Sequence, residues 1–306
     1  MIARTVLLQM AGNKKMESFA RHNPMAAGMA KRFIAGENLD QITAPVRLLN
    51  QQGLTVSLDY LGESVTTQAE VAEVVDTYLR LFAHIRQEKL DANVSIKLTS
   101  VGLDMDPDFC SRNMQRLLQN AGPDQFVRID MEGTSHTQRT LDLFYNLWDG
   151  PEPHKNTGVV IQSYLQRSEA DIEKLIASGV RVRLCKGAYK EPPDLAFQDK
   201  TEVDSNFIKL MHRLLQSGNY PGIATHDSRM IEAAQAFAKE NKIPTSRYEF
   251  QMLYGVRRDL QIELKRQGYN VRIYTPFGTH WYPYMMRRLA ERPANLAFAL
   301  RSMTGK

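Results

Sequence analysis

Short runs of β-branched and other apolar residues recur along the chain, with room for a helix between each pair. Several runs are nearly continuous in valine, isoleucine and leucine, as parallel strands buried on both faces tend to be. The pattern predicts strands over residues 54–59, 94–98, 126–131, 158–163, 180–185, 222–225, 247–252 and 270–274.

The segments between these runs carry apolar side chains at helical spacing, together with start and stop signals. Residues 205–216 show the spacing clearly, and Gly218 follows directly. Asp106 before Pro107 predicts an N-cap with proline at the first helical position. Ser168 with Asp171 resembles a capping box at the start of a helix that Gly179 ends.

Strands that alternate with helices in this way predict an α/β protein built as a (β/α)8 barrel of the TIM type. A doubly wound open sheet is the alternative. Such a sheet usually carries GxGxxG after its first strand, but none of the 18 glycines is two residues from another. The barrel is therefore favoured.

Residues 1–53 precede the first strand and predict extra N-terminal helices over 25–35 and 39–52, with Asp40 and Thr43 as candidate caps. We expect this segment to pack outside or beneath a barrel formed by residues 54–306, in a single domain overall. Residues 1–16 contain three cations and no acid, which predicts an amphipathic helix, with a targeting signal as the alternative.

Composition is that of a globular protein: 306 residues are 43% hydrophobic and 24% charged. The net charge of +5 favours an anionic partner, such as a phosphate-bearing cofactor or an anionic membrane surface. No apolar run approaches the ~20 residues of a membrane span. Cys110 and Cys185 form no CxxC pair, the histidines lack metal-type spacing, and no lysine or arginine run indicates nucleic acid. We therefore expect neither a metal nor a nucleic-acid partner.

Polar residues gather where the predicted strands end, which is where a barrel places its chemistry. Each has a structural explanation: Asp130 could pair with Arg128, Lys97 or Arg183, and His226 could be a capping or core histidine. Their joint presence at one mouth favours a site. The residues in question are Lys97, Asp130, Gln162, Arg183, Lys186, Thr225, His226 and Tyr274.

Adjacent arginines stand near the C-terminal end, in the stretch Tyr284-Met-Met-Arg287-Arg288-Leu-Ala-Glu291. Each guanidinium can bind a carboxylate with two parallel hydrogen bonds, so the pair has the makings of a carboxylate clamp. An exposed helix with an ordinary ion pair is the alternative.

Cations and tyrosines dominate the candidate site, and no nucleophile elbow or Ser/His/Asp order is evident. This combination indicates a small anionic substrate with an apolar body, beside a phosphate-bearing cofactor. Two alternatives stay open: a cofactor-free lyase that uses Lys97 as a Schiff base, and a non-catalytic barrel that binds anions.

Motifs spread over residues 54–300 resemble the proline dehydrogenase family. Each is weak alone, but together and in register they are specific. They are Leu58-Asp-Tyr-Leu-Gly-Glu63, Ser95-Ile-Lys97-Leu, Arg128-Ile-Asp130-Met131-Glu, Arg183-Leu-Cys-Lys186-Gly-Ala-Tyr189, Ala224-Thr-His226, Phe250-Gln-Met-Leu253, Ile273-Tyr274-Thr-Pro-Phe-Gly and the stretch from Tyr284 to Glu291.

The resemblance implies a flavoenzyme with a distorted (β/α)8 barrel that binds FAD. Such an enzyme oxidises L-proline to 1-pyrroline-5-carboxylate by hydride transfer to flavin N5 and passes the electrons to a membrane quinone, the first step of proline degradation to glutamate. The chain looks like the monofunctional bacterial type, so a separate pyrroline-5-carboxylate dehydrogenase would act next. A cytoplasmic location, peripheral on the inner face of the membrane, is expected.

The resemblance also implies a role for individual residues. Asp130 and Arg183 match the catalytic acidic and basic residues. Arg287 and Arg288, with Lys97 beside them, match the groups that hold the proline carboxylate, and Glu63 matches an acid that pairs with Arg287 on closure. The residues that match the cage around the pyrrolidine ring are Tyr189, Leu253, Tyr274 and Tyr284. Tyr274 would leave no room for a hydroxyl on that ring. The FAD contacts match Met131, Gln162, Lys186, Gly187, Ala188, Thr225, His226 and, on the cofactor side, Glu291.

Overall fold

The structure, a computed structural model, describes residues 32–62 and 65–291, together with residues 16, 20, 23 and 28. Most of the helix predicted over 25–35, and nearly all of residues 1–16, lie outside this part of the chain. Arg32 and Phe33 form a turn, so the predicted helix does not reach residue 35.

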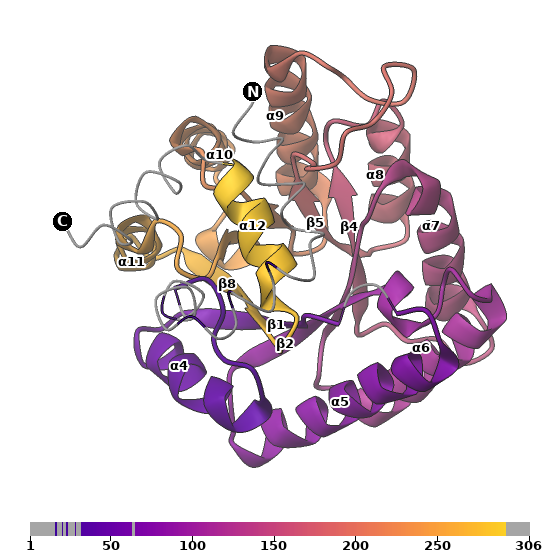
Figure 1. Ribbon diagram of the computed structural model, residues 1–306. Helices are drawn as coiled ribbons and strands as arrows, with labels where there is room; N and C mark the ends of the chain where they lie inside the picture. Colours follow the sequence, from indigo (N-terminus) through magenta and orange to yellow (C-terminus); the bar gives the residue numbers. More distant parts are fainter. Residues whose placement is uncertain are drawn as a thin grey trace.

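The strands pair in parallel in chain order and close into a barrel, because β8 pairs with β1 (Figure 1). The closed ring confirms the (β/α)8 prediction, and the open-sheet alternative is wrong. The strands are β1 (Thr55–Tyr60), β2 (Ala92–Lys97), β3 (Val127–Asp130), β4 (Thr157–Gln162), β5 (Arg181–Cys185), β6 (Gly222–Ala224), β7 (Glu249–Leu253) and β8 (Asn270–Phe277).

A ring of helices surrounds the barrel, and their apolar faces pack with the strands into one core. Short 3-10 turns, η1 (Leu98–Val101) and η2 (Thr245–Arg247), follow β2 and precede β7. The outer helices that follow strands are α5 (Gln68–Gln87), α6 (Pro107–Ala121), α7 (Thr134–Asp149), α8 (Ser168–Ala177), α9 (Lys200–Ser217), α10 (Ser228–Glu240) and α11 (Arg258–Arg266).

Helix α4 (Leu39–Gln51), which precedes β1, completes this ring between α11 and α5 (Figure 1). Its buried face, with Ile42 and Val46, joins the main core. Thr43 Oγ1 lies 2.7 Å from Nε2 of His84 on α5. Packing outside the barrel was expected, but the predicted caps are wrong, because the side chain of Asn38 accepts the hydrogen bond at the N-terminus.

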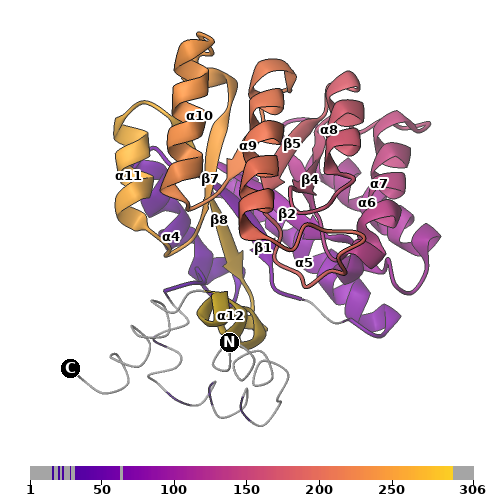
Figure 2. The same cartoon turned by 90° about the horizontal axis from the view of Figure 1, so that it is seen from above.

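Helix α12 (Trp281–Glu291), which follows β8, leaves the ring and lies beyond the carboxyl ends of the strands (Figure 2). A second apolar cluster holds it there, in which Trp281 and Tyr284 pack with Phe33, Leu61 and Val256. Trp281 Nε1 also donates to Glu37 Oε1 at 2.9 Å. The N-terminal segment therefore supports the helix that covers the mouth.

Local sequence signals explain which predicted helix and strand boundaries agree with the structure and which do not. Asp106 caps α6 with Pro107 at its first position, as predicted. The capping box at Ser168 is wrong, because α8 begins without a side-chain cap and the Ser168 hydroxyl donates to the Gln162 carbonyl instead. Strand β8 runs past its predicted end because Pro276 and Phe277 stay paired with Asp59 and Tyr60 of β1. The Pro276 carbonyl also accepts a hydrogen bond from Ala35 N, at 3.0 Å.

Candidate active site at the carboxyl ends of the strands

Arg183 and Asp130 form a buried ion pair across the barrel, from β5 to β3. Arg183 Nη1 donates to Asp130 Oδ1 at 2.7 Å, and the two residues are 5% and 8% exposed. Arg183 Nη2 donates to the hydroxyls of Ser57 and Ser95 at 3.3 and 3.1 Å, and its Nε donates to Gln251. Every nitrogen of the guanidinium is therefore held.

Tyr274 on β8 connects this ion pair to Lys97. Its hydroxyl donates to Asp130 Oδ2 at 2.7 Å, and its ring lies 5.2 Å from the Arg183 guanidinium carbon. Burial and the charge of Asp130 raise the pKa of Tyr274 well above its usual value, so the phenol stays protonated and remains a donor. Lys97 Nζ lies 3.5 Å from the same hydroxyl.

Asp59 is a site residue that the sequence interpretation missed. It is 1% exposed at the end of β1, and Lys97 Nζ donates to its two carboxylate oxygens at 3.0 and 2.9 Å. Its position at the end of the first predicted strand was a usable signal. The pair shows that Lys97 has a fixed counter-ion.

A second group of charges surrounds Lys186, just beyond β5. Its Nζ donates to Asp204 on α9 at 2.5 Å and to Asp227, the N-cap of α10, at 2.9 Å. Arg229 donates to the same two carboxylates, at 3.0 and 3.3 Å. Burial alone would raise the pKa of Asp227, but the hydrogen bonds from Lys186 and Arg229 lower it to about 2.

Four further predicted cofactor residues lie around the same rim. Gln162 is 2% exposed and donates to the Glu132 carbonyl at 2.8 Å. His226 Nε2 accepts from the backbone N–H of Leu253 at 2.8 Å, which requires that this ring nitrogen carry no proton. Met131 and Thr225 are each 7% exposed.

The connection from β5 to α9 carries three predicted residues, Gly187, Ala188 and Tyr189. Gly187 has φ +106°, and a Cβ there would lie 2.3 Å from the Tyr164 ring, so only glycine fits. Ala188 is exposed, and Tyr189 is 47% exposed and near Gly133, whose added Cβ would lie 4.0 Å from its ring. The described contacts do not place Tyr189 beside Tyr274.

Glu191 attaches this connection to α7, a contact that the sequence did not reveal. Its Oε1 accepts from the backbone N–H of Thr134 at 2.9 Å, and the Thr134 hydroxyl donates to its other oxygen. Since Gly133 offers no side-chain cap, Glu191 supplies the acceptor for the first turn of α7 from a distant part of the chain.

The predicted clamp lies on α12. Tyr284 is 7% exposed in the apolar cluster of that helix, against which Leu253 also packs, so these two predicted cage residues share one environment. The backbones of Arg287, Arg288 and Glu291 belong to the same helix, but their side chains lie outside the described residues. Glu63 also lies outside them.

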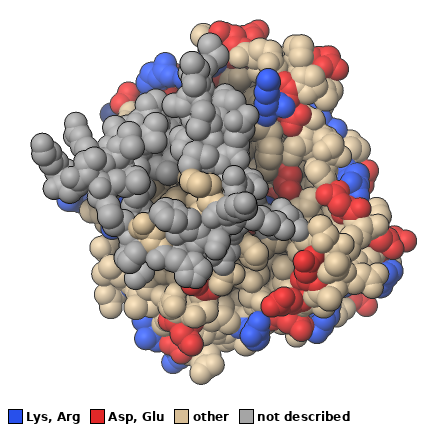
Figure 3. Space-filling view, viewed as in Figure 1, with Lys and Arg blue, Asp and Glu red and all other residues tan. Residues whose placement is uncertain are grey.

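The space-filling view toward α12 shows acidic and basic side chains interspersed around the described rim (Figure 3).

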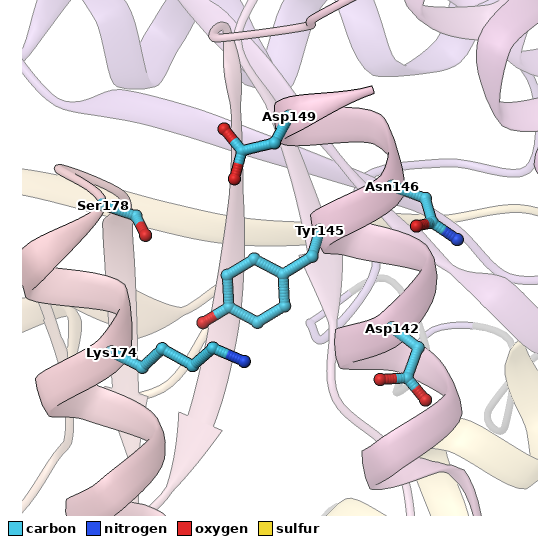
Figure 4. Close-up of a pocket in the computed structure, with 6 residues that line it drawn as sticks. All are labelled: Asp142, Tyr145, Asn146, Asp149, Lys174 and Ser178. Atoms are coloured by element: carbon cyan, nitrogen blue, oxygen red, sulfur yellow. The ribbon is translucent and has the colours of Figure 1, made fainter. Parts of the chain in front are cut away.

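A separate cleft lies between α7 and α8, on the outer surface of the barrel. Figure 4 shows Lys174 of α8 reaching toward Tyr145 of α7, whose ring centroid is 4.4 Å from Lys174 Nζ. This cleft contains none of the residues gathered at the mouth.

Among the residues that the structure describes, no group of three or more histidine, cysteine, aspartate or glutamate side chains could hold a metal ion. In the same part of the chain, every helix is too short or too polar to cross a membrane.

These features define a (β/α)8-barrel enzyme with a charged and aromatic mouth. Comparison with known proteins identifies its family: the chain matches the family model for proline dehydrogenase over residues 42–301. It is 41% identical to "Proline dehydrogenase 2" of Bacillus subtilis, covering 100% of both chains, and 38% identical to "Proline dehydrogenase" of Deinococcus radiodurans, covering 98% of this chain and 97% of the relative. The chain belongs to the proline dehydrogenase family and is an oxidoreductase that acts on proline. Membership implies flavin dependence.

Solved structures agree with the fold. The proline utilization A protein (PutA) of Bdellovibrio bacteriovorus, crystallised after inactivation by N-propargylglycine, superposes with a TM-score of 0.81 at 28% identity. The alignment covers 87% of this chain but 33% of that one, so the chain spans about a third of the PutA length. The similarity therefore concerns one part of a larger protein.

Proposed function

We propose that this protein is an FAD-dependent proline dehydrogenase that oxidises L-proline to 1-pyrroline-5-carboxylate. The observation that carries the proposal is the buried Arg183, held by Asp130, Gln251 and serine hydroxyls at the mouth where Lys97 and Tyr274 also meet. A permanent cation fixed in a desolvated position suits stabilisation of negative charge that develops during reaction.

The residues at the rim fit FAD by the chemistry of their donors. Lys186 is a cation for the phosphates, and its side chain is 24% exposed although it is paired with two carboxylates. Gln162, Thr225 and His226 supply further polar groups, and Met131 an apolar contact, while Gly187 and Ala188 would contribute backbone. When bound, FAD supplies the acceptor for the hydride that leaves the ring carbon beside the proline nitrogen.

We assign the carboxylate of proline to Arg287 and Arg288 on α12, together with Lys97. Lys97 is held by Asp59 and lies close to Tyr274, so its charge stays at one place on the mouth. Binding the carboxylate there orients the ring and supplies much of the rate by positioning. Glu63 would pair with Arg287 once the site closes, and Glu291 would face the cofactor.

The cage for the pyrrolidine ring is assigned to Tyr274, Tyr284, Leu253 and Tyr189. An apolar cage excludes water and favours the neutral amine, which must form before hydride can leave. The Tyr274 hydroxyl donates to Asp130 at 2.7 Å. We expect the tyrosine at this position to favour proline over hydroxyproline, because a smaller residue there would leave room for the ring hydroxyl. Asp130, which accepts hydrogen bonds at both oxygens, would hold Arg183 and Tyr274 in place.

The contacts of Lys97 argue against the lyase alternative. A Schiff-base lysine attacks as a neutral amine. Lys97 Nζ instead donates to both oxygens of the buried Asp59 carboxylate, which favours the ammonium form. A carboxylate-binding cation fits these contacts better than a nucleophile does.

We further propose a membrane quinone as the electron acceptor and a separate pyrroline-5-carboxylate dehydrogenase as the next enzyme. The net charge of +5 supports peripheral docking of a cytoplasmic protein on the inner, anionic face of a membrane. The packing of α4 into the main core supports one functional domain, with residues 1–53 as an N-terminal helical segment on the barrel of residues 54–306.

Anaerobic titration of the purified protein with L-proline tests the proposal. A yellow protein whose flavin absorbance bleaches on adding L-proline, but not on adding hydroxyproline at the same concentration, is the expected result. A protein that stays colourless after FAD is supplied would reject it. Reduction of a quinone in membrane vesicles by the protein and proline then tests the acceptor.

A further inference from the structure

A chain of hydrogen bonds inside the barrel connects its interior to Arg183. Arg272 Nε donates to Glu249 Oε1 at 2.8 Å, and Gln251 Nε2 donates to the same oxygen at 2.5 Å. Gln251 Oε1 then accepts from Arg183 Nε. Glu249 and Gln251 are 2% and 3% exposed, so water does not compete for these contacts.

The two neighbours of Gln251 fix the orientation of its amide. Its oxygen faces a cation, Arg183, and its nitrogen faces an anion, Glu249. A flipped amide would place N–H against N–H on one side and oxygen against carboxylate on the other, and in a buried site neither clash is relieved by solvent. Burial would raise the pKa of Glu249, but the charge of Arg272 lowers it overall, which keeps this anchor ionised.

Gly222 on β6 provides the space that this arrangement needs. A Cβ at Gly222 would lie 2.4 Å from Gln251 Nε2 and 2.8 Å from its amide carbon. The absence of a side chain at Gly222 on β6 therefore leaves the space that the Gln251 amide occupies. Any larger residue at position 222 would have to displace the amide from Arg183.

We propose that Gln251, oriented by Glu249, is a positioning residue that sets the plane of the Arg183 guanidinium toward the cofactor. Asp130 holds Nη1 at 2.7 Å, but the serine contacts of Nη2 are longer, at 3.1 and 3.3 Å. The Nε contact is the one nearest the stem of the side chain, and it limits rotation of the whole fork. The inference rests on the proposed role of Arg183 beside the flavin.

Gln251→Leu is the direct test, because leucine fills similar space and removes both hydrogen bonds. We expect kcat to fall about 10- to 100-fold, as a small misplacement of a catalytic group does, with KM for proline changed by less than about 3-fold. The midpoint potential of the bound flavin should become more negative, since the cation stabilises the reduced form less well. An unchanged kcat and potential would overturn the inference.

A readout that needs no flavin separates positioning from activity. In the flavin-free protein labelled with ¹⁵N-arginine, the Nε–H proton of Arg183 should exchange with water slowly, and faster in Gln251→Leu. Equal exchange rates in the two proteins would show that Gln251 does not hold this group.

Two further variants keep the test valid if Gln251→Leu folds poorly. The exchange Glu249→Gln with Gln251→Glu retains the charge and an acceptor for Arg183, so we expect it to recover most of the kcat that either single change loses. Gly222→Ala leaves the glutamine in the chain but displaces it, and should reproduce the kcat loss. Failure of both expectations would overturn the inference.

Gln125→Leu is the matched control for buried glutamine loss. Gln125 is 7% exposed and donates to the Ala92 carbonyl at 2.7 Å, at the start of β2 and away from the mouth. It should lower thermal stability without altering kcat, the flavin potential or the exchange of Arg183. Arg183→Lys separates the proposed function of Arg183 from the positioning role of Gln251. If Arg183→Lys retains full kcat, the proposed function of Arg183 fails. If Arg183→Lys loses kcat but Gln251→Leu does not, only the positioning role is rejected.

Discussion

Replacement of Asp130 tests whether its carboxylate holds the centre of the site together. The carboxylate is 8% exposed and accepts hydrogen bonds of 2.7 Å from both Arg183 and Tyr274. Removing one partner of a buried ion pair costs about 3–5 kcal/mol, because the remaining charge stays desolvated. Asp130→Ala should therefore lower the free energy of unfolding by this amount.

Asp130→Asn separates charge from shape. The amide oxygen can still accept from Arg183, but the amide nitrogen can only donate to the Tyr274 hydroxyl oxygen. The hydrogen bond that Tyr274 donates to a charged group, worth about 1.5–3 kcal/mol, is therefore lost. We expect a loss of ~2 kcal/mol or slightly more from this contact. Tyr274→Phe removes the same hydrogen bond from the other side and should cost a similar amount.

The assay is urea unfolding of the flavin-free protein, followed by kinetics of the reconstituted enzyme. Because both changes remove one shared hydrogen bond, the double variant Asp130→Asn with Tyr274→Phe should lose less than the sum of the single losses, by about 0.5–3 kcal/mol. Strictly additive losses, or an Asp130→Ala protein as stable as the parent with the same kcat, would refute the reasoning from this geometry.

Other predictions concern the rim. Arg288→Ala should raise KM for proline, because ~2–5 kcal/mol of binding free energy is lost with the charge pair. An unchanged KM would reject the clamp. Asp227→Asn keeps a helix N-cap but removes the charge that binds Lys186. Because the folded pKa of Asp227 is lowered to about 2 from 3.8, this stabilisation is complete above pH ~4 and is lost as pH falls toward 2. The difference in melting temperature between parent and variant should shrink over that interval, and a constant difference would contradict the assignment. Glu191→Ala should speed tryptic cleavage after Lys190, since the connection loses its attachment to α7, and equal cleavage rates would show that the contact does not hold it.

The strands were predictable in number, order and approximate extent because parallel strands buried on both faces consist of short apolar runs. Such runs can be recognised in the sequence without knowing the rest of the fold. Strand β8 extends three residues past its predicted end at Tyr274, through Pro276, although proline is rare inside strands. Here Pro276 pairs opposite Asp59 and its carbonyl binds Ala35, a contact between distant segments that no local pattern encodes.

For the candidate site, the sequence predicted which residues lie at the mouth, and their roles stay predictions. Arg183 was among the partners considered for Asp130, but the contact with Tyr274 was not foreseen. Asp130, Arg183 and Tyr274 were expected together, and they are joined by hydrogen bonds. The roles of Asp59 and Gln251 were missed, since a polar residue at a strand end shows that it faces the mouth, whereas its partner depends on strand register. The roles of the side chains on α12 stay predictions.

Closure of the barrel by β1 and β8 has a consequence for how the chain is made. Thr55 and Arg272 are neighbours in this pair, and Arg272 Nη1 donates to the Val56 carbonyl across 216 positions of sequence. Until β8 has left the ribosome, Glu249 has no Arg272, Asp130 has no Tyr274, and the first strand has an open edge. A nascent chain that stops short of β8 would leave Glu249 without its cationic partner and β1 with an open edge. The barrel can therefore close only after β8 has been made, and a shortened chain would present an open strand edge to proteases and chaperones.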